Sequence, residues 1–446
     1  MATATFELRD ALLRKTVAWC HERSSFYRER FPSADFAGLE AIAQLPVLHR
    51  HQVVDHHAEL RCDDALPAGI QHTTGTTGQF LQLYRSPSEQ AFIWNFFAQQ
   101  MPEIEAGKVR PLHLSLANAY HGALIPVPSR AYVLSVGVHD RAQASQAQGV
   151  LERSYDLPGI QSRISVITGT ERMIMALTAY LLAKKFDFSS CQVRRIALFG
   201  GHVPLARKQL LAQIWFAEDR KGTIQDHYSL TEMFGGAKEC GLGGPWVFDP
   251  HIIPEVVHPT THEPIESGVG MLLLTSLFPF VQQMPLVRYV TGDLVEVVDG
   301  PEGPAGLTVR YVGRMPRSVL HLHDGKVRPL LLSGPLYERL LSLPDLAITP
   351  RFPDLQIGVG LELTGDLHYR VDHREAAGQT PEQITIEIGL RYAPWMYPSR
   401  VATLVKELAE DLFALNPYLA ECVADKRVEL HLRPKPASEV PIHDSK

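Results

Sequence analysis

The sequence predicts an α/β fold, in which a large N-terminal domain of layered mixed β-sheets and helices precedes a small, mobile α+β C-terminal domain. Three observations support this prediction. Short apolar runs alternate with amphipathic helical segments over the first two-thirds of the chain. A turn-rich segment, VEVVDGPEGPAG at residues 295–306, then interrupts the pattern. Beyond it, segments with strand-like alternation surround one long amphipathic helix.

The large domain begins with helices and continues with alternating strands and helices. Residues 1–65 read as helices joined by turns. The segment ERMIMALTAYLLAKKF, residues 171–186, places Met173, Leu177 and Leu181 at helical spacing. The following RRIALFGG, residues 194–201, is a short apolar run that ends in two glycines. It predicts a buried strand that runs into a loop.

The small domain is predicted from four segments. Residues 355–372 resemble a hairpin, and QITIEIGLRYA, residues 383–393, alternates like a strand. A helix is expected over residues 398–417, with Val401, Leu404 and Leu408 on its apolar stripe. RVELHLRP, residues 427–434, predicts a final strand. We place the domain boundary between Gly313 and Arg314, so that the domains cover residues 1–313 and 314–446.

Composition excludes several classes of protein. The chain has 446 residues and a formal net charge of -6, which argues against a nucleic-acid partner. Its five cysteines are widely spaced and form no CxxC pair, so a disulfide framework is not expected. The N-terminal segment lacks the uninterrupted apolar run of a secretory signal, and no run is long enough for a membrane span. The expected location is the cytoplasm.

Two histidine-rich groups invite a metal interpretation. HRHQVVDHH, residues 49–57, has no recognised zinc-ligand spacing, and a solvated helix face is the better interpretation. Cys240 with His251, His258 and His262 supplies a single thiol, so a structural zinc is not expected.

The segment HTTGTTG, residues 72–78, is the first candidate for chemistry. Glycines permit a tight concave loop in which successive backbone N–H groups converge, and threonine hydroxyls add donors. Such a loop can hold phosphates, although it lacks the Walker pattern. A polar surface turn is the alternative, and the loop alone does not decide between the two.

Two further segments carry candidate side chains. YSLTE places Tyr228, which could stack on a base, four residues before Glu232, which could hold Mg²⁺. TGDL at residues 291–294 presents Asp293 from a predicted turn, where it could accept hydrogen bonds from a ribose. The plain alternatives are a loop with a buried tyrosine and a hairpin turn. A second TGDL, residues 364–367, is interpreted as a plain hairpin turn.

In this order and at these separations, the segments resemble the adenylate-forming enzymes: acyl-CoA synthetases, adenylation domains of peptide synthetases and beetle luciferases. The phenylacetate-CoA ligase branch is the most similar. SSFYRERF (24–31), HTTGTTG, YSLTE, the segment 268–297 and YVGRMPRSVLHLHDGKVRP (311–329) carry the resemblance.

The resemblance implies a two-step, AMP-forming ligase. A carboxylate, expected to be small and aromatic, attacks the α-phosphorus of ATP in the presence of Mg²⁺, and the thiol of coenzyme A then displaces AMP. The implied partners are thus small molecules, and a homodimer is compatible with the resemblance.

The resemblance also implies roles for individual residues. ATP phosphates would be held by Thr73, Thr74, Gly75, Thr76, Thr77 and Gly78. Adenine would lie on Tyr228 beside Gly200 and Gly201, and ribose on Asp293. Glu232 would bind Mg²⁺, Thr231 the α-phosphate, and Arg314 the ribose or a phosphate. The acyl pocket would be lined by Tyr120, His121, Gly122 and His202.

Four positions depart from the pattern. Gln79 replaces a lysine after the phosphate loop, and His202 replaces a glutamate. Pro316 and Arg317 replace acidic residues at the hinge, where a proline restricts the backbone. Lys446 is the candidate for the catalytic lysine. Two alternatives therefore stay open: transfer to a carrier-protein thiol or an amine, and a non-catalytic nucleotide-binding relative.

Overall fold

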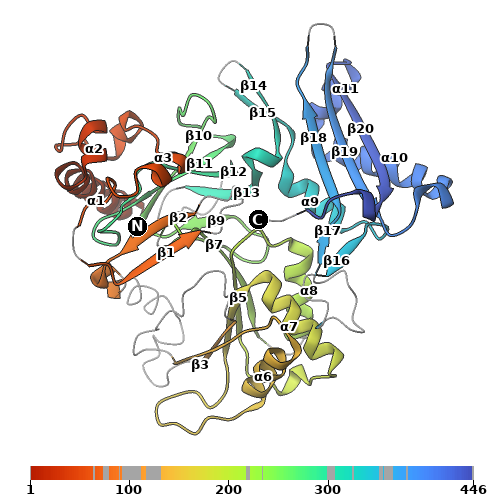
Figure 1. Ribbon diagram of the computed structural model, residues 1–446, viewed down its shortest axis with the longest axis horizontal. Coiled ribbons are helices and arrows are strands. Elements are labelled where there is room, and N and C mark those ends of the chain that lie inside the picture. Colours follow the sequence, from red (N-terminus) through yellow and green to blue (C-terminus); the bar gives the residue numbers. More distant parts are fainter. Residues whose placement is uncertain are drawn as a thin grey trace.

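The structure is a computed structural model (Figure 1). It describes residues 2–63, 66–73, 80–89, 91–92, 112–116, 132–216, 221–233, 235–298, 307–323, 326–350, 355, 365–377 and 380–443. The predicted α/β fold is confirmed. A large sheet with helices occupies the N-terminal two-thirds of the chain, and a separate α+β unit follows it.

The N-terminal segment is helical, as predicted. It contains α1 (Ala2–Arg23), α2 (Ser25–Arg30), a 3-10 helix (Leu39–Gln44) and α3 (Arg50–Asp55). Ser24 caps α2 by accepting a hydrogen bond from the Tyr27 N–H, and His49 forms a capping box with Gln52 at the start of α3. The apolar side of α1 is buried against the large sheet, with Leu13 and Val17 fully inaccessible to solvent.

The large sheet has eleven strands in the order β10-β11-β12-β13-β9-β8-β7-β6-β5-β3-β4. One half is parallel and comprises β3 (Leu112–Leu116), β4 (Tyr132–Val136), β5 (Val166–Thr170), β6 (Arg195–Phe199) and β7 (Thr223–Ser229). The other half is antiparallel and comprises β8 (Gly236–Glu239), β9 (Trp246–Phe248), β10 (Ile252–Val257), β11 (Gly268–Ser276), β12 (Tyr289–Val297) and β13 (Thr308–Arg314).

The helices α6 (Arg141–Glu152), α7 (Glu171–Ala183) and α8 (Leu205–Trp215) pack on the parallel half. The apolar stripe predicted for residues 171–186 lies in α7, where Met173, Leu177 and Leu181 are buried. The predicted strand at 194–201 is β6. A separate hairpin of β1 (Gly69–Thr73) and β2 (Leu81–Arg85) lies beside the sheet.

The C-terminal unit has its own core, built from residues from Val319 onward. It starts with the hairpin β14 (Val319–His323) and β15 (Lys326–Leu331), followed by α9 (Ser333–Leu341). A three-stranded sheet of β18 (Tyr369–Arg374), β19 (Glu382–Leu390) and β20 (Val428–Pro436) packs against α10 (Pro398–Leu415) and α11 (Pro417–Ala424). Leu404 and Leu408 are buried, as their spacing predicts. The boundary at residues 313 and 314 stays a proposal.

Of the hairpin predicted over residues 355–372, only residues 355 and 365–372 belong to the described part of the chain, so the hairpin stays a prediction. The second TGDL contributes β17 (Gly365–Leu367), which pairs with β16 (Ile348–Pro350), whereas β18 pairs with β19. Local alternation could not show this, because the pairing partners are chosen by burial against the rest of the unit.

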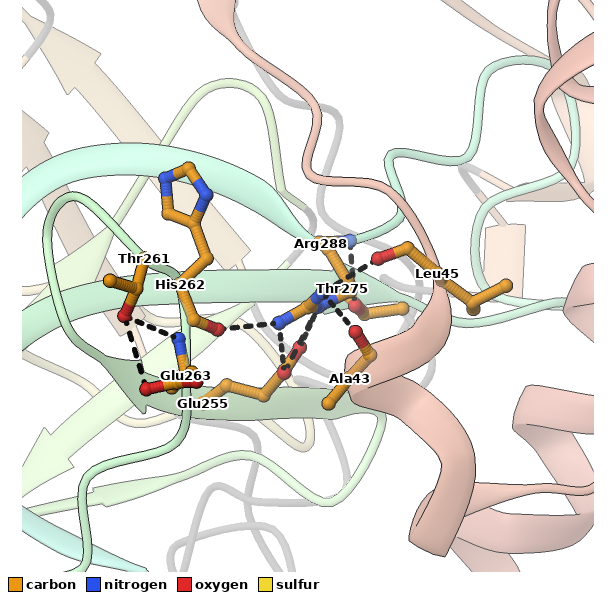
Figure 2. Close-up of polar contacts among 8 residues, drawn as sticks. All are labelled: Ala43, Leu45, Glu255, Thr261, His262, Glu263, Thr275 and Arg288. Carbon is orange, nitrogen blue, oxygen red and sulfur yellow. Dashed lines mark hydrogen bonds and ion pairs between the residues drawn. The ribbon is translucent and has the colours of Figure 1, made fainter.

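Arg288 joins the N-terminal helical segment to the large sheet (Figure 2). Its buried guanidinium donates to the carbonyl oxygens of Ala43 and Leu45 at 3.0 and 2.6 Å. The same group lies 3.0 Å from a carboxylate oxygen of Glu255 on β10. Its backbone N–H donates to Thr275 on β11. The charge is therefore paired and its donors are satisfied, as burial requires.

Two absences hold for the described part of the chain. There, no helix is both long and apolar enough to span a bilayer. The same residues contain no group of three or more His, Cys, Asp or Glu side chains placed to hold a metal ion. The His49 and His51 rings stack on each other, and the His49 ring also contacts His262. The Cys240 thiol is free and exposed.

Candidate nucleotide site

The candidate residues gather at the carboxyl ends of the parallel strands. In open α/β sheets, this edge is where ligands bind. Gly200 and Gly201 directly follow β6, and Tyr228 is the penultimate residue of the neighbouring β7. Gly200 has a φ of +88°, and an added Cβ would lie 3.2 Å from the Thr170 side chain at the end of β5. A glycine is therefore suited to this turn.

Tyr228 and Asp293 are in direct contact. The phenol of Tyr228 donates a 2.7 Å hydrogen bond to the Asp293 carboxylate, although three strands separate β7 from β12 in the sheet order. Arg314 at the end of β13 places its Nε 3.4 Å from the other Asp293 oxygen and donates to the carbonyl of Thr291. Three residues from separate segments thus form one cluster.

The sequence suggested that Asp293 projects from a turn, but the structure places it in a strand. It lies inside β12, which runs through the TGDL segment and pairs with β13 opposite Arg314. Gly292, with a φ of +77°, lies where the register between β12 and β11 shifts. The carboxylate is consequently held on a rigid strand.

Burial dominates the electrostatics of this cluster. Burial raises the pKa of Asp293 above its usual value, although Arg314 and Tyr228 act to lower it. The pKa of Tyr228 is also raised well above its usual value, first by burial and then by the Asp293 charge. Tyr228 therefore stays a hydrogen-bond donor to Asp293.

Glu232 lies just after β7, with its carboxylate close to two further segments. Its Oε1 is 3.2 Å from a guanidinium nitrogen of Arg50, the first residue of α3, and accepts a 3.1 Å hydrogen bond from Tyr289. The fully buried Arg85 at the end of β2 donates to the carbonyl oxygens of Thr231 and Glu232 at 3.1 Å each. This turn is therefore fixed by β2, α3 and β12 together.

Stacked rings extend from this cluster toward the C-terminal unit. Tyr228 packs on Trp246 with ring centroids 5.2 Å apart, and Trp246 on Tyr311 at 5.7 Å. Tyr311 in turn stacks on His202 at 5.0 Å. The His202 imidazole lies 3.2 Å from Glu338 of α9. The predicted substrate role of His202 is not tested by this arrangement and stays a prediction.

Several predicted residues fall outside the described part of the chain. They are Thr74, Gly75, Thr76, Thr77 and Gly78 of the loop, Tyr120, His121 and Gly122 of the acyl segment, and Lys446. Thr73 is described and pairs with Leu81 at the end of the β1–β2 hairpin. Since Arg85 on β2 also bonds to Gln71 and to the Thr231 carbonyl, this hairpin is tied to the Glu232 turn.

His443 lies beside the segment predicted to be the hinge. Its Nε2 is 2.9 Å from the Tyr369 hydroxyl and 3.4 Å from a guanidinium nitrogen of Arg317, and its ring stacks on Tyr369. Pro316 and Arg317 belong to a short 3-10 helix, Met315–Arg317, that follows β13 directly. The proposed catalytic role of Lys446 is untested.

Sequence reasoning missed Arg50, Arg85 and Tyr289. Tyr289 had a usable signal, because it shares the buried face of β12 with Thr291 and Asp293 at a period of two. Arg50 and Arg85 had none, since they meet Glu232 across 182 and 147 residues of sequence.

A cavity of about 490 Å³ lies apart from the candidate nucleotide residues. It is enclosed by β15, α9, α10 and α11 on one side, and on the other by the end of the β11–β12 pair where Val269 lies opposite Glu296. It is lined mainly by leucines and prolines and contains none of the candidate nucleotide residues. The candidate nucleotide site is therefore defined by the cluster of Tyr228, Asp293 and Arg314 at the edge of the sheet and not by this cavity.

Parts of the sequence are similar to phenylacetate-coenzyme A ligases. Over 313 residues, 64% of the chain, the sequence is 28% identical to the phenylacetate-coenzyme A ligase of Thermus thermophilus. It is 33% identical to the Escherichia coli enzyme of that name over 139 residues, 29% of the chain and 28% of the relative. These similarities agree with the resemblance to phenylacetate-CoA ligases that the motifs indicate. No family model matches it.

The match covers 64% of the Thermus protein's own length. Among solved structures, an open conformation of 2-hydroxyisobutyryl-CoA ligase in complex with 2-HIB-AMP and CoA has a TM-score of 0.66 at 16% identity. The alignment covers 97% of this chain and 88% of that one. At this identity the likeness establishes the fold alone.

Proposed function

We propose that the protein is an ATP-dependent acid–thiol ligase, which activates a small aromatic carboxylic acid as an acyl-adenylate and transfers it to the thiol of coenzyme A. The observation that supports this most strongly is the convergence of Tyr228, Asp293 and Glu232 at the ligand-binding edge of the sheet. These side chains suit a base, a ribose and a metal-bound phosphate.

In the first step, a carboxylate oxygen of the acid attacks the α-phosphorus of ATP, and pyrophosphate leaves. Asp293 would hold the ribose hydroxyls and Tyr228 would support the adenine. Both are preorganised, because their mutual hydrogen bond and Arg314 fix them before any ligand binds. Thr231 and Arg314 would contact phosphate or ribose oxygens, as the resemblance implies.

Glu232 fits a magnesium-binding role, because it is a carboxylate at the ligand edge whose present partners are one cation and one hydroxyl. Bound Mg²⁺ would neutralise phosphate charge in this site. Glu232 would hold the ion through its oxygens, while Tyr289 keeps the carboxylate oriented. Arg50, now paired with Glu232, would turn toward a phosphate and supply a positive charge that Gln79 does not.

In the second step, a thiol sulfur attacks the carbonyl carbon of the adenylate, and AMP leaves. Coenzyme A is the acceptor we propose, in keeping with the relatives' names. Transfer to a carrier-protein thiol or an amine is the second candidate, favoured by the hinge, where Pro316 sits in a 3-10 helix and Arg317 contacts His443. A homodimer and a cytoplasmic location stay predictions.

Exchange of labelled pyrophosphate into ATP, measured across a panel of aromatic and aliphatic acids, tests the proposal. We expect exchange that depends on an aromatic acid. When coenzyme A is added, we expect the coenzyme A thioester of that acid. Exchange without a thioester would favour the second candidate. If no acid supported exchange, the protein would instead be a nucleotide-binding relative without catalysis.

A further inference from the structure

Two contacts connect the C-terminal unit to the ligand edge of the large sheet. Both start from residues in the segment that follows β6. His202 lies in the turn after β6, and Arg207 lies in the first turn of α8. In Figure 1, α8 lies next to α9 and to the β16–β17 pair of the C-terminal unit.

The first contact centres on the Glu338 carboxylate. It lies 3.2 Å from His202 Nε2 and also accepts from the backbone N–H of Leu205, the first residue of α8. A carboxylate at this position complements both the unpaired N–H groups and the positive end of the helix dipole. Although burial raises its pKa, His202, Leu205 and Lys208 together lower the pKa of Glu338, so the contact is with the ionised form.

The second contact centres on the buried Arg207 guanidinium. One nitrogen donates to Glu171, the first residue of α7, at 2.6 Å. Another nitrogen donates to the carbonyl oxygen of Gly365 in β17 at 2.7 Å. Burial raises the pKa of the Tyr337 phenol on α9 to about 12, and the nearby Arg207 guanidinium acts to lower it. Arg207 thus bridges α7 of the large unit and two elements of the C-terminal unit.

We propose that Glu338 and Arg207 are positioning residues that hold the C-terminal unit against the ligand edge of the large sheet. They contact α8, which begins four residues after Gly201, and the His202 ring, which stacks on Tyr311. The second TGDL segment consequently has a role in docking, because its Gly365 carbonyl is the acceptor for Arg207. The relevance of this docking to catalysis rests on the function proposed above, whereas the contacts themselves do not.

The geometry makes the two contacts unequal. Arg207 and Glu171 are mostly buried, with side chains 7% and 12% exposed, so removing the arginine leaves a buried carboxylate without its partner. Glu338 is 42% exposed, and its replacement leaves no buried charge. Glu338→Gln is therefore the variant in which docking can be changed with the least effect on folding.

Distance measurement between two dyes tests the proposal. Cys240 is exposed in the large unit, and the other four cysteines are buried, so it can be labelled selectively. The second dye goes on Ala402→Cys, an exposed position in α10. The labelled full chain is compared with the same chain carrying Glu338→Gln or Arg207→Gln. Glu59→Gln, which breaks an exposed pair with His56 within the large unit, is the matched control.

We expect a narrow distribution of transfer efficiency in the parent and in Glu59→Gln, without any ligand. Glu338→Gln should add a second population at lower efficiency while the melting temperature stays within a few degrees, and Arg207→Gln should enlarge that population. A distribution for Glu338→Gln identical to the parent's would overturn the proposal, whatever happens to Arg207→Gln. Because the measurement needs no substrate, its failure is distinct from an absence of pyrophosphate exchange.

Discussion

At the scale of single residues, the candidate site is a set of carboxylates that the protein buries and then supports with fixed partners. Asp293 is held by Tyr228 and Arg314, and Glu232 by Tyr289 and Arg50. Each carboxylate keeps acceptor capacity beyond these bonds, since an ionised carboxylate offers about four lone-pair positions. That remaining capacity is what a ribose or a metal ion would use.

Asp293→Asn tests the ribose assignment. The amide keeps the shape of the side chain but loses the charge that strengthens hydrogen bonds to the ribose. Such bonds contribute roughly 1.5–3 kcal/mol, so AMP should bind about 10- to 100-fold more weakly. Isothermal titration calorimetry with AMP measures the change. Asp372→Asn, an exposed substitution on β18, should bind like the parent. Unchanged affinity in Asp293→Asn would remove Asp293 from the site.

Glu232→Gln tests the metal and phosphate assignment. Removing one charge-stabilising group from a site of this kind slows the chemical step by roughly 10²-fold or more. Pyrophosphate exchange should fall by about that factor, while Tyr289→Phe, which removes only the hydroxyl that orients Glu232, should have a smaller effect. Exchange in Glu232→Gln at the parental rate would show that the carboxylate is outside the reaction.

At the scale of elements, local pattern predicted the strands and helices whose burial follows a simple period. The stripe of α10 and the short apolar run of β6 are examples, because one face of each element is buried. Asp293 and the second TGDL were misplaced for the opposite reason. A glycine next to a polar residue usually marks a turn, but here Gly292 permits a bulge in β12 opposite β11, and Gly365 lies in β17.

The site was predictable only where its residues belong to compact motifs. Tyr228, Glu232 and Asp293 lie in short segments, and their side-chain types alone suggest contacts with a base, a metal ion and a ribose. Arg50, Arg85 and Arg207 act through partners far away in the chain or through backbone carbonyl oxygens. A carbonyl acceptor leaves no mark in the sequence, so these contacts required the folded structure.

Arg288→Met tests the junction between the N-terminal helices and the sheet. The substitution leaves the Glu255 carboxylate buried without its cation and the Ala43 and Leu45 carbonyls without their donor. Breaking a buried pair in this way costs roughly 3–5 kcal/mol, to be measured as a loss of unfolding free energy in urea. Arg310→Met, at an exposed pair, should change it by no more than about 0.5 kcal/mol. A small effect at both positions would contradict the role of Arg288.

At the scale of the whole molecule, two units with separate cores meet at the ligand edge of one sheet, and buried histidines make the large unit sensitive to acid. Burial lowers the pKa of His113 on β3 to about 4, with Arg195 adding to the shift. In the unfolded chain its pKa is about 6.5, so the unfolded state binds more protons between these values. Stability therefore falls as the pH drops from about 6.5 toward about 4.

His113→Gln isolates this contribution. Each pKa unit corresponds to about 1.36 kcal/mol, so the parent should lose up to roughly 3 kcal/mol to His113 between pH 6.5 and pH 4. The variant lacks this group and should show a shallower dependence over the same window. Urea unfolding at a series of pH values gives both curves. Parallel curves for parent and variant would mean that His113 titrates normally in the folded state.

The central claim is that one nucleotide spans β7, the Glu232 turn and β12 at the carboxyl edge of the sheet. A crystal structure of the full chain grown with AMP tests it most directly. We predict the adenine ring against Tyr228 beside Gly200 and Gly201, and both ribose hydroxyls within hydrogen-bonding distance of Asp293. Electron density for AMP on any other face of the molecule would contradict the account.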